Sequence, residues 1–243
     1  MPALITTLSS SISLLCGFLM FLYLMHQIEV ADPESNLHIY SREEGFGFMM
    51  EMLISNILVC MRFTSIIDRI FFMLMFGIMI VHAHTDKKTK TVYRPFNYIL
   101  WIIGIIYTAI KLILKDFPQA NEGWKQTLVF IGMFILIVWI FTFIFHTSGK
   151  GDGYMLIGLA FFVSFLSKDT PFISLIITLV FYIIAGVLQV IINIKQFQFK
   201  KLIFKEKIPF APSMLFGLWV ILIVSYLCAS SSFNIWYINH LIL

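Results

Sequence analysis

Long apolar runs of about 20 residues recur along this chain, with short polar segments between them. A helical run of this length matches the thickness of the hydrocarbon core of a bilayer. Of the 243 residues, 60% are hydrophobic and only 12% are charged. This composition excludes a disordered chain, a collagen and a nucleic-acid-binding domain, and it argues strongly against a soluble globular fold. No strand-like alternation appears, and a lipid-exposed backbone must satisfy its own hydrogen bonds. The runs therefore predict an all-α, polytopic membrane bundle, with residues 1–243 forming a single membrane domain.

Eight of these runs predict about eight transmembrane helices. They cover residues 4–25, 46–66, 70–84, 96–114, 127–146, 154–167, 172–194 and 211–228. The second run is interrupted by Glu51 and Arg62, so an interfacial helix is the alternative to a span there. We favour two successive spans, with Asp68 and Arg69 forming a tight polar turn between the second run and the third.

Basic residues indicate how the predicted helices are oriented. Most of the 17 Lys and Arg residues lie in polar segments that would share one side of the membrane. These segments are 26–45, 85–95, 147–153 and 195–209. Because loops rich in Lys and Arg stay on the cytoplasmic side, this side is predicted to be cytoplasmic and both chain termini to face the other way.

Two aspartates lie on this basic side, each next to an apolar run. Asp86 follows the third run and precedes several lysines, and Asp152 lies between the fifth and sixth runs. A carboxylate at membrane depth is energetically costly and is usually functional. Two carboxylates that meet share one proton, so one can take a proton from water while the other donates to a scissile carbonyl, as in aspartic proteases. On the residues alone, a loop aspartate paired with lysines and an ordinary polar turn at 149–153 are the alternatives.

The residues around both aspartates resemble the motifs of the type IV prepilin peptidases. The segment 149–152, Gly-Lys-Gly-Asp, resembles the GxGD motif of that family, and Asp86 stands before a basic stretch as the family's first aspartate does. The segment 207–212, Lys-Ile-Pro-Phe-Ala-Pro, resembles the IPFxP segment that opens the family's last span. The three elements occur in the family's order, and the resemblance covers a peptidase core over 70–228.

This resemblance implies a membrane aspartic endopeptidase that removes the short basic leader from type IV prepilin-like or pseudopilin precursors. Asp86 and Asp152 would be the catalytic residues, and no cofactor or metal is expected. The residues that would support the motifs are Gly149, Gly151, Gly153, Pro209 and Pro212. The glycines would let the backbone adopt a positive φ and let a substrate strand approach closely.

The same resemblance implies a location and partners. The location is the cytoplasmic membrane of a prokaryote, crossed several times, with the active site at the cytoplasmic face. The partners are the prepilin or pseudopilin precursor, the lipid bilayer, and a pilus or secretion machinery, without nucleic acid.

The sequence departs from the family pattern at three places. Tyr154 stands where the family commonly has Lys, and the segment 91–95 lacks the Ile-Pro that often ends the basic stretch. These two differences bear on substrate preference. The short cytoplasmic segment 26–45 contains no cysteine, whereas many bacterial members carry two CxxC pairs there. Because that Cys-rich segment is associated with N-methylation, we predict leader cleavage and assign no N-methyltransferase activity.

Other classes of function are kept as alternatives. A metal or ion transporter could be built from histidine and carboxylate side chains near one membrane face, because both are ligands for transition metals. Its residues would be His82, His84, Asp86 and His146. His82 and Asp86 are four residues apart and can share one helix face, whereas His84 points elsewhere. A non-catalytic assembly partner would keep the fold without turnover, and a presenilin-like protease would cut within spans.

Overall fold

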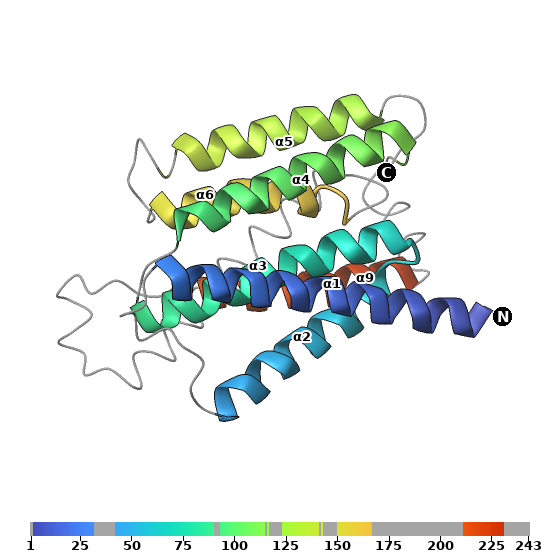
Figure 1. Cartoon of the computed structure of the whole chain (residues 1–243). Helices are drawn as coiled ribbons and strands as arrows, with labels where there is room; N and C mark the ends of the chain where they lie inside the picture. The colour runs from blue at the N-terminus through green and yellow to red at the C-terminus, as the bar shows by residue number, and fades with distance from the viewer. Residues whose placement is uncertain are drawn as a thin grey trace.

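The chain forms a bundle of α-helices, shown in Figure 1. The computed structural model describes residues 2–31, 42–89, 93–114, 116, 123–140, 142, 150–166 and 211–230. These residues form α1 (Pro2–Ala31), α2 (Arg42–Arg62), α3 (Ile66–Thr89), α4 (Arg94–Leu114), α5 (Gly123–Trp139), α6 (Lys150–Val163) and α9 (Ala211–Ser230). No strand occurs among them, so the all-α prediction is confirmed for the part of the chain that is described.

Four of the helices are long and apolar enough to cross a membrane. Their apolar parts are Thr7–Ala31, Glu43–Arg62, Ile66–Thr89 and Arg94–Leu114. The second of these is α2, which therefore suits a span as well as the interfacial position. Helix α6 has 14 residues, so it is about 21 Å long and shorter than the hydrocarbon core. The described residues thus support a helical membrane protein with four candidate spans and not the eight predicted; the run 172–194 lies outside them.

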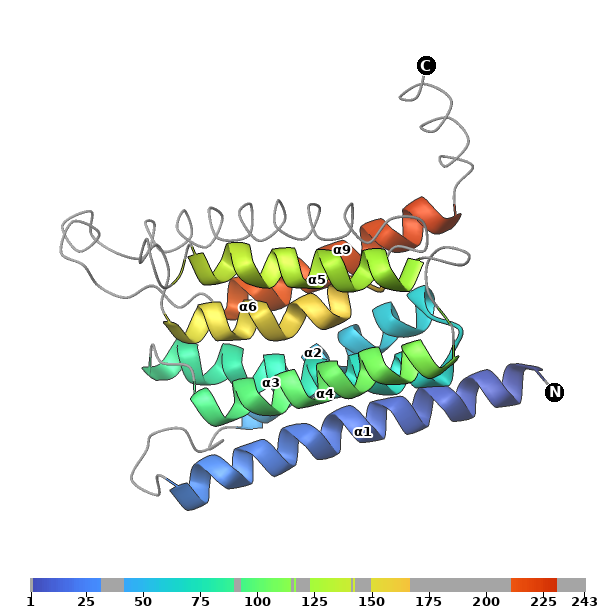
Figure 2. The same cartoon turned by 90° about the horizontal axis from the view of Figure 1, so that it is seen from above.

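The helices pack in two groups that meet at α3 and α4. Helices α1, α2 and α9 pack against α3, and α4 and α5 pack against α6, as Figures 1 and 2 show. Helix α3 is the most enclosed of the four candidate spans. Its approach to α1 depends on two glycines, because a Cβ atom on Gly77 would lie 2.6 Å from the Gly17 carbonyl oxygen. Small residues let helix backbones approach closely in membranes, where apolar side chains gain little by leaving lipid.

The connection between α2 and α3 differs from the prediction. Asp68 and Arg69 do not form a turn; residues 63–65 connect the helices, and both charged residues lie buried in the first turn of α3. Burial is possible because each has partners. The Asp68 carboxylate binds Lys111 Nζ at 2.7 Å, and Arg69 Nε donates to the Phe63 carbonyl oxygen at 2.8 Å. A sequence window shows two adjacent charges but not the distant residue that neutralises one of them.

One end of the bundle carries the exposed basic residues Lys87, Lys88, Arg94 and Lys150, and we call it the basic end. Helix α3 finishes there, while α4, α6 and α9 begin there, at the left of Figure 2. The predicted polar segment 26–45 is partly helical at this end. Helix α1 continues through Ala31 and α2 begins at Arg42, so only the residues between these helices lie outside the described part.

Candidate functional site

Asp86 lies inside a helix and not in the loop that the sequence predicts. Helix α3 continues to Thr89, and Asp86 is 4% exposed. Two features occur in the last turn of this helix. The Thr89 hydroxyl donates to the Thr85 carbonyl oxygen at 2.8 Å, and two lysines in the last turn face the negative end of the helix dipole. One of them, Lys88, lies 3.0 Å from the Glu44 carboxylate on α2.

The Asp86 carboxylate holds the start of α9. Its Oδ2 atom accepts a hydrogen bond from the backbone N–H of Ala211 at 2.8 Å. The first N–H groups of a helix have no partner within the helix, so a carboxylate there satisfies a donor and complements the positive end of the dipole. Ala211 and Pro212 belong to the IPFxP-like segment. The structure therefore joins two of the three motif elements, although Pro209 lies outside the described residues.

Asp152 lies half-buried in the first turn of α6. The turn is held to α4 by Asn97, whose Nδ2 atom donates to the Gly151 carbonyl oxygen at 3.3 Å. Gly153 is helical and does not have a positive φ, contrary to the expected role of these glycines. A Cβ atom on Gly153 would collide with the Thr142 side chain. Packing against Thr142 therefore requires a glycine at position 153. Gly149 lies outside the described residues.

The first turns of α4 bring the surroundings of both aspartates together. The His82 ring, one turn before Asp86, packs against Phe96 with 6.0 Å between ring centroids. The next residue, Asn97, binds the peptide group before Asp152. Asp86 and Asp152 therefore both lie at the basic end, with α4 in contact with the segments that carry them.

Several buried polar atoms at this end have no hydrogen-bond partner. Among the described residues they are both ring nitrogens of His82, Oδ1 of Asn97 and Oγ of Ser213. All three side chains are at most 3% exposed. In the sequence, His82 stands out only as a ligand of the transporter alternative, and no motif points to Asn97 or Ser213. One sequence feature could have indicated Asn97 and Ser213: each is a polar residue near the start of an apolar run.

The two histidines of α3 point to different neighbours. The His82 ring lies against Phe96 of α4, whereas the His84 ring lies 4.7 Å from the ring of Phe48 on α2. In the described part of the chain, no group of three or more His, Cys, Asp or Glu residues could hold a metal ion. His146 lies outside that part.

A second polar cluster occupies the opposite end of the bundle. The Asp68 carboxylate accepts a hydrogen bond from the Tyr107 hydroxyl at 2.8 Å and pairs with Lys111. Lys111 also lies 2.6 Å from the Asp116 carboxylate. Nearby, Arg62 Nε donates to the Ser225 hydroxyl at 3.1 Å. Here the buried charges have partners, as a structural network requires.

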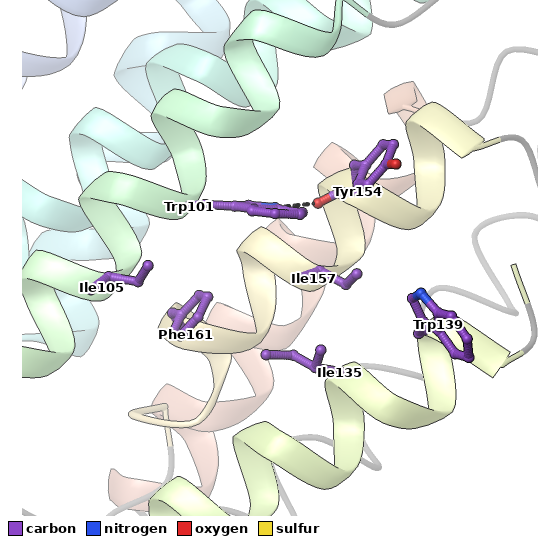
Figure 3. A pocket seen from close by; sticks show the side chains of 7 residues that line it. All are labelled: Trp101, Ile105, Ile135, Trp139, Tyr154, Ile157 and Phe161. Atoms are coloured by element: carbon purple, nitrogen blue, oxygen red, sulfur yellow. Dashed lines mark hydrogen bonds between the residues drawn. The ribbon is translucent and has the colours of Figure 1, made fainter. Parts of the chain in front are cut away.

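An apolar cavity of about 500 Å³ lies between α4, α5 and α6. Figure 3 shows its lining, which consists of Trp101, Ile105, Ile135, Trp139, Tyr154, Ile157 and Phe161. Trp101 Nε1 donates to the Tyr154 carbonyl oxygen at 2.7 Å and closes the upper wall in that view. Tyr154 and Asp152 both lie near the start of α6, but Asp152 is not among the residues that line the cavity.

Comparison with known proteins identifies no relative: no protein-family model, no curated protein and no solved structure matches this chain. The resemblance to prepilin peptidases therefore depends on the three motif elements alone.

Proposed function

We propose that this chain is a membrane aspartic endopeptidase that removes the short basic leader from a prepilin-like or pseudopilin precursor. The observation that carries the proposal is the 2.8 Å hydrogen bond between Asp86 Oδ2 and the Ala211 backbone N–H. It joins two motif elements that are 125 residues apart in sequence. Each element resembles the family independently of the other, so their contact supports a common site.

The membrane arrangement in this proposal extends the four candidate spans to eight, with both termini outside. The basic end is then at the cytoplasmic face of a prokaryotic cytoplasmic membrane, because Lys and Arg stay on that side. Asp86 and Asp152 lie near this face. A precursor whose apolar helix lies in the bilayer presents its leader at the same depth.

In the proposed reaction, Asp86 and Asp152 share one proton. The ionised carboxylate takes a proton from a water molecule, whose oxygen attacks the scissile carbonyl carbon. The protonated carboxyl donates to the carbonyl oxygen. The tetrahedral intermediate collapses, the C–N bond breaks, and the leaving amine takes a proton, so no covalent enzyme intermediate forms. The N–H of Ala211 holds the Asp86 carboxylate in one orientation for this step.

The apolar cavity supports the same proposal. Its wall includes Tyr154, two residues from Asp152. An apolar segment that fills this space packs against α6, the helix that carries Asp152 in its first turn. Such a segment follows the leader in prepilin-like precursors.

The test uses membranes that contain the protein and a precursor with a basic leader, a glycine and an apolar helix. Asp86→Asn and Asp152→Asn should each stop leader removal. Asp116→Asn is the matched control, because Asp116 is exposed at the opposite end; it should cleave like the wild type. Cleavage at the wild-type rate by either of the first two variants would refute the assignment.

A non-catalytic assembly partner is the second candidate, and one observation favours it. The bond from Ala211 gives Asp86 a structural role at the start of α9 that needs no chemistry. In that case Asp152→Asn would change nothing, and the wild type would not process any precursor. A transporter would instead show metal in the purified protein, and chelation would abolish its activity.

A further inference from the structure

Among the described residues, the buried side-chain atoms that have no hydrogen-bond partner lie toward the basic end of the bundle. Those of His82, Asn97 and Ser213 lie on three different helices, α3, α4 and α9. A buried polar atom without a partner has lost its bonds to water and gained nothing in return. Buried polar groups at the other end do have partners. There the Asp68 carboxylate accepts a hydrogen bond from the Tyr107 hydroxyl and pairs with Lys111.

Each unpaired side chain lies within about one helical turn of a contact made by the proposed site. His82 is four residues before Asp86 and on the same face of α3. Ser213 is two residues after Ala211, whose N–H binds Asp86. Asn97 holds the peptide group before Asp152 through its Nδ2 atom and leaves its Oδ1 atom unpaired.

The unpaired atoms match what a peptide main chain offers. A neutral imidazole has one donor and one acceptor nitrogen, a hydroxyl both donates and accepts, and an amide oxygen accepts. A peptide group supplies one N–H donor and one C=O acceptor. Extended peptides are often bound through their main-chain groups, which gives affinity without dependence on side chains.

We propose that His82, Asn97 and Ser213 bind main-chain peptide groups of the precursor beside the scissile bond. This inference rests on the proposed peptidase function and adds the residues that recognise the substrate. The three groups have no partner in the described part of the chain, and the peptide would satisfy them on binding. Removing such a group therefore weakens peptide binding without weakening the fold.

The test combines thermal unfolding with cleavage kinetics in Ser213→Ala and His82→Phe. Both variants replace an unpaired polar group with an apolar group of similar shape, so the Tm should be unchanged or higher. The KM for the precursor should rise about tenfold for the loss of one hydrogen bond, with kcat nearly unchanged.

Ser55→Ala is the matched control. The Ser55 hydroxyl donates to the Glu51 carbonyl oxygen at 2.8 Å and accepts from Trp219 Nε1 at 2.9 Å. Removing a bonded hydroxyl should lower the Tm and leave KM unchanged, which is the opposite pattern. If Ser213→Ala and His82→Phe lower the Tm and leave KM unchanged, the groups are structural and the inference is overturned.

Capture of the uncleaved precursor separates this inference from the proposed function. The measurement uses Asp152→Asn protein in detergent with a fluorescent synthetic precursor, with and without Ser213→Ala. An approximately tenfold weaker Kd with Ser213→Ala supports the inference even if the wild type fails to cleave. An unchanged Kd, or no capture in either protein, overturns it, whereas cleavage by the wild type decides the proposed function separately.

Discussion

The carboxylate of Asp86 accepts a hydrogen bond from the Ala211 backbone N–H and also supplies half of the proposed catalytic pair. Two substitutions separate these roles. Asparagine keeps a carbonyl oxygen that can accept the bond but cannot exchange a proton as a carboxyl does. Leucine keeps a similar size and loses both abilities.

We expect Asp86→Asn to unfold close to the wild type while losing leader cleavage. Asp86→Leu should lose cleavage and also about 0.5–2 kcal/mol of stability, the usual effect of removing a helix N-cap. Denaturant unfolding in detergent and a cleavage assay measure the two effects. Equal stability of the two variants would show that the bond to Ala211 does not hold α9.

The buried charges at the opposite end predict a larger change in stability. Lys111→Met leaves the Asp68 carboxylate without its 2.7 Å ion pair, although Tyr107 still donates to it. Loss of one partner of a buried pair costs about 3–5 kcal/mol. The double variant with Asp68→Asn should recover much of that loss, because no uncompensated charge remains. Additive effects in unfolding experiments would contradict the coupling.

At the level of whole helices, α1 and α3 pack closely because glycines face each other where they meet. Gly77 and Gly17 meet so closely that an added Cβ on either would be within 2.8 Å of a backbone oxygen. Backbone atoms cannot move aside as the end of a flexible side chain does. The position of α3, and with it that of Asp86, therefore depends on a residue with no side chain.

Gly77→Ala should lower stability by about 1–3 kcal/mol, the usual effect of overpacking. Gly132→Ala in α5 is the matched control, because a Cβ there meets nothing within 4 Å. The control should be neutral or more stable, since alanine favours helices by about 1 kcal/mol over glycine. Similar melting temperatures for the two variants would show that α1 and α3 are not packed this closely.

For the whole molecule, hydropathy predicts the positions of the helices well, because an apolar helix can be recognised from consecutive residues alone. All seven described helices overlap predicted runs. The error at Asp68 arose because its burial depends on Tyr107 and Lys111, about 40 residues away. Hydropathy read along the sequence cannot distinguish a buried charge that has a partner from a charge in a polar turn.

The candidate site shows the same limit. The motifs predict Asp86, Asp152 and the start of the last helix as parts of the site. In the structure, Asp86 contacts the start of the last helix at Ala211. Asn97 and Ser213 could not be found in that way. Each is an ordinary polar residue in its own sequence context. Whether its side-chain atom finds a hydrogen-bond partner depends on how the helices pack around it, which the local sequence does not show.

The orientation of the bundle gives a prediction for the whole molecule. After replacement of the native cysteines, Lys87→Cys and Lys150→Cys at the basic end should react with an impermeant thiol reagent only from the cytoplasmic side. Lys125→Cys, exposed at the start of α5, should react only from the other side, because α5 begins at the opposite end (Figure 2). Labelling of all three from one side would contradict a bundle that crosses the membrane in this way.

The central claim is tested most directly by the mass of the product made by purified protein in lipid vesicles. With a precursor that carries a basic leader, a glycine and an apolar helix, the wild type should release the leader by one cut just before the apolar helix. Asp86→Asn and Asp152→Asn should leave the precursor at its full mass. An uncut precursor with the wild type, or the same product from either variant, would contradict the account.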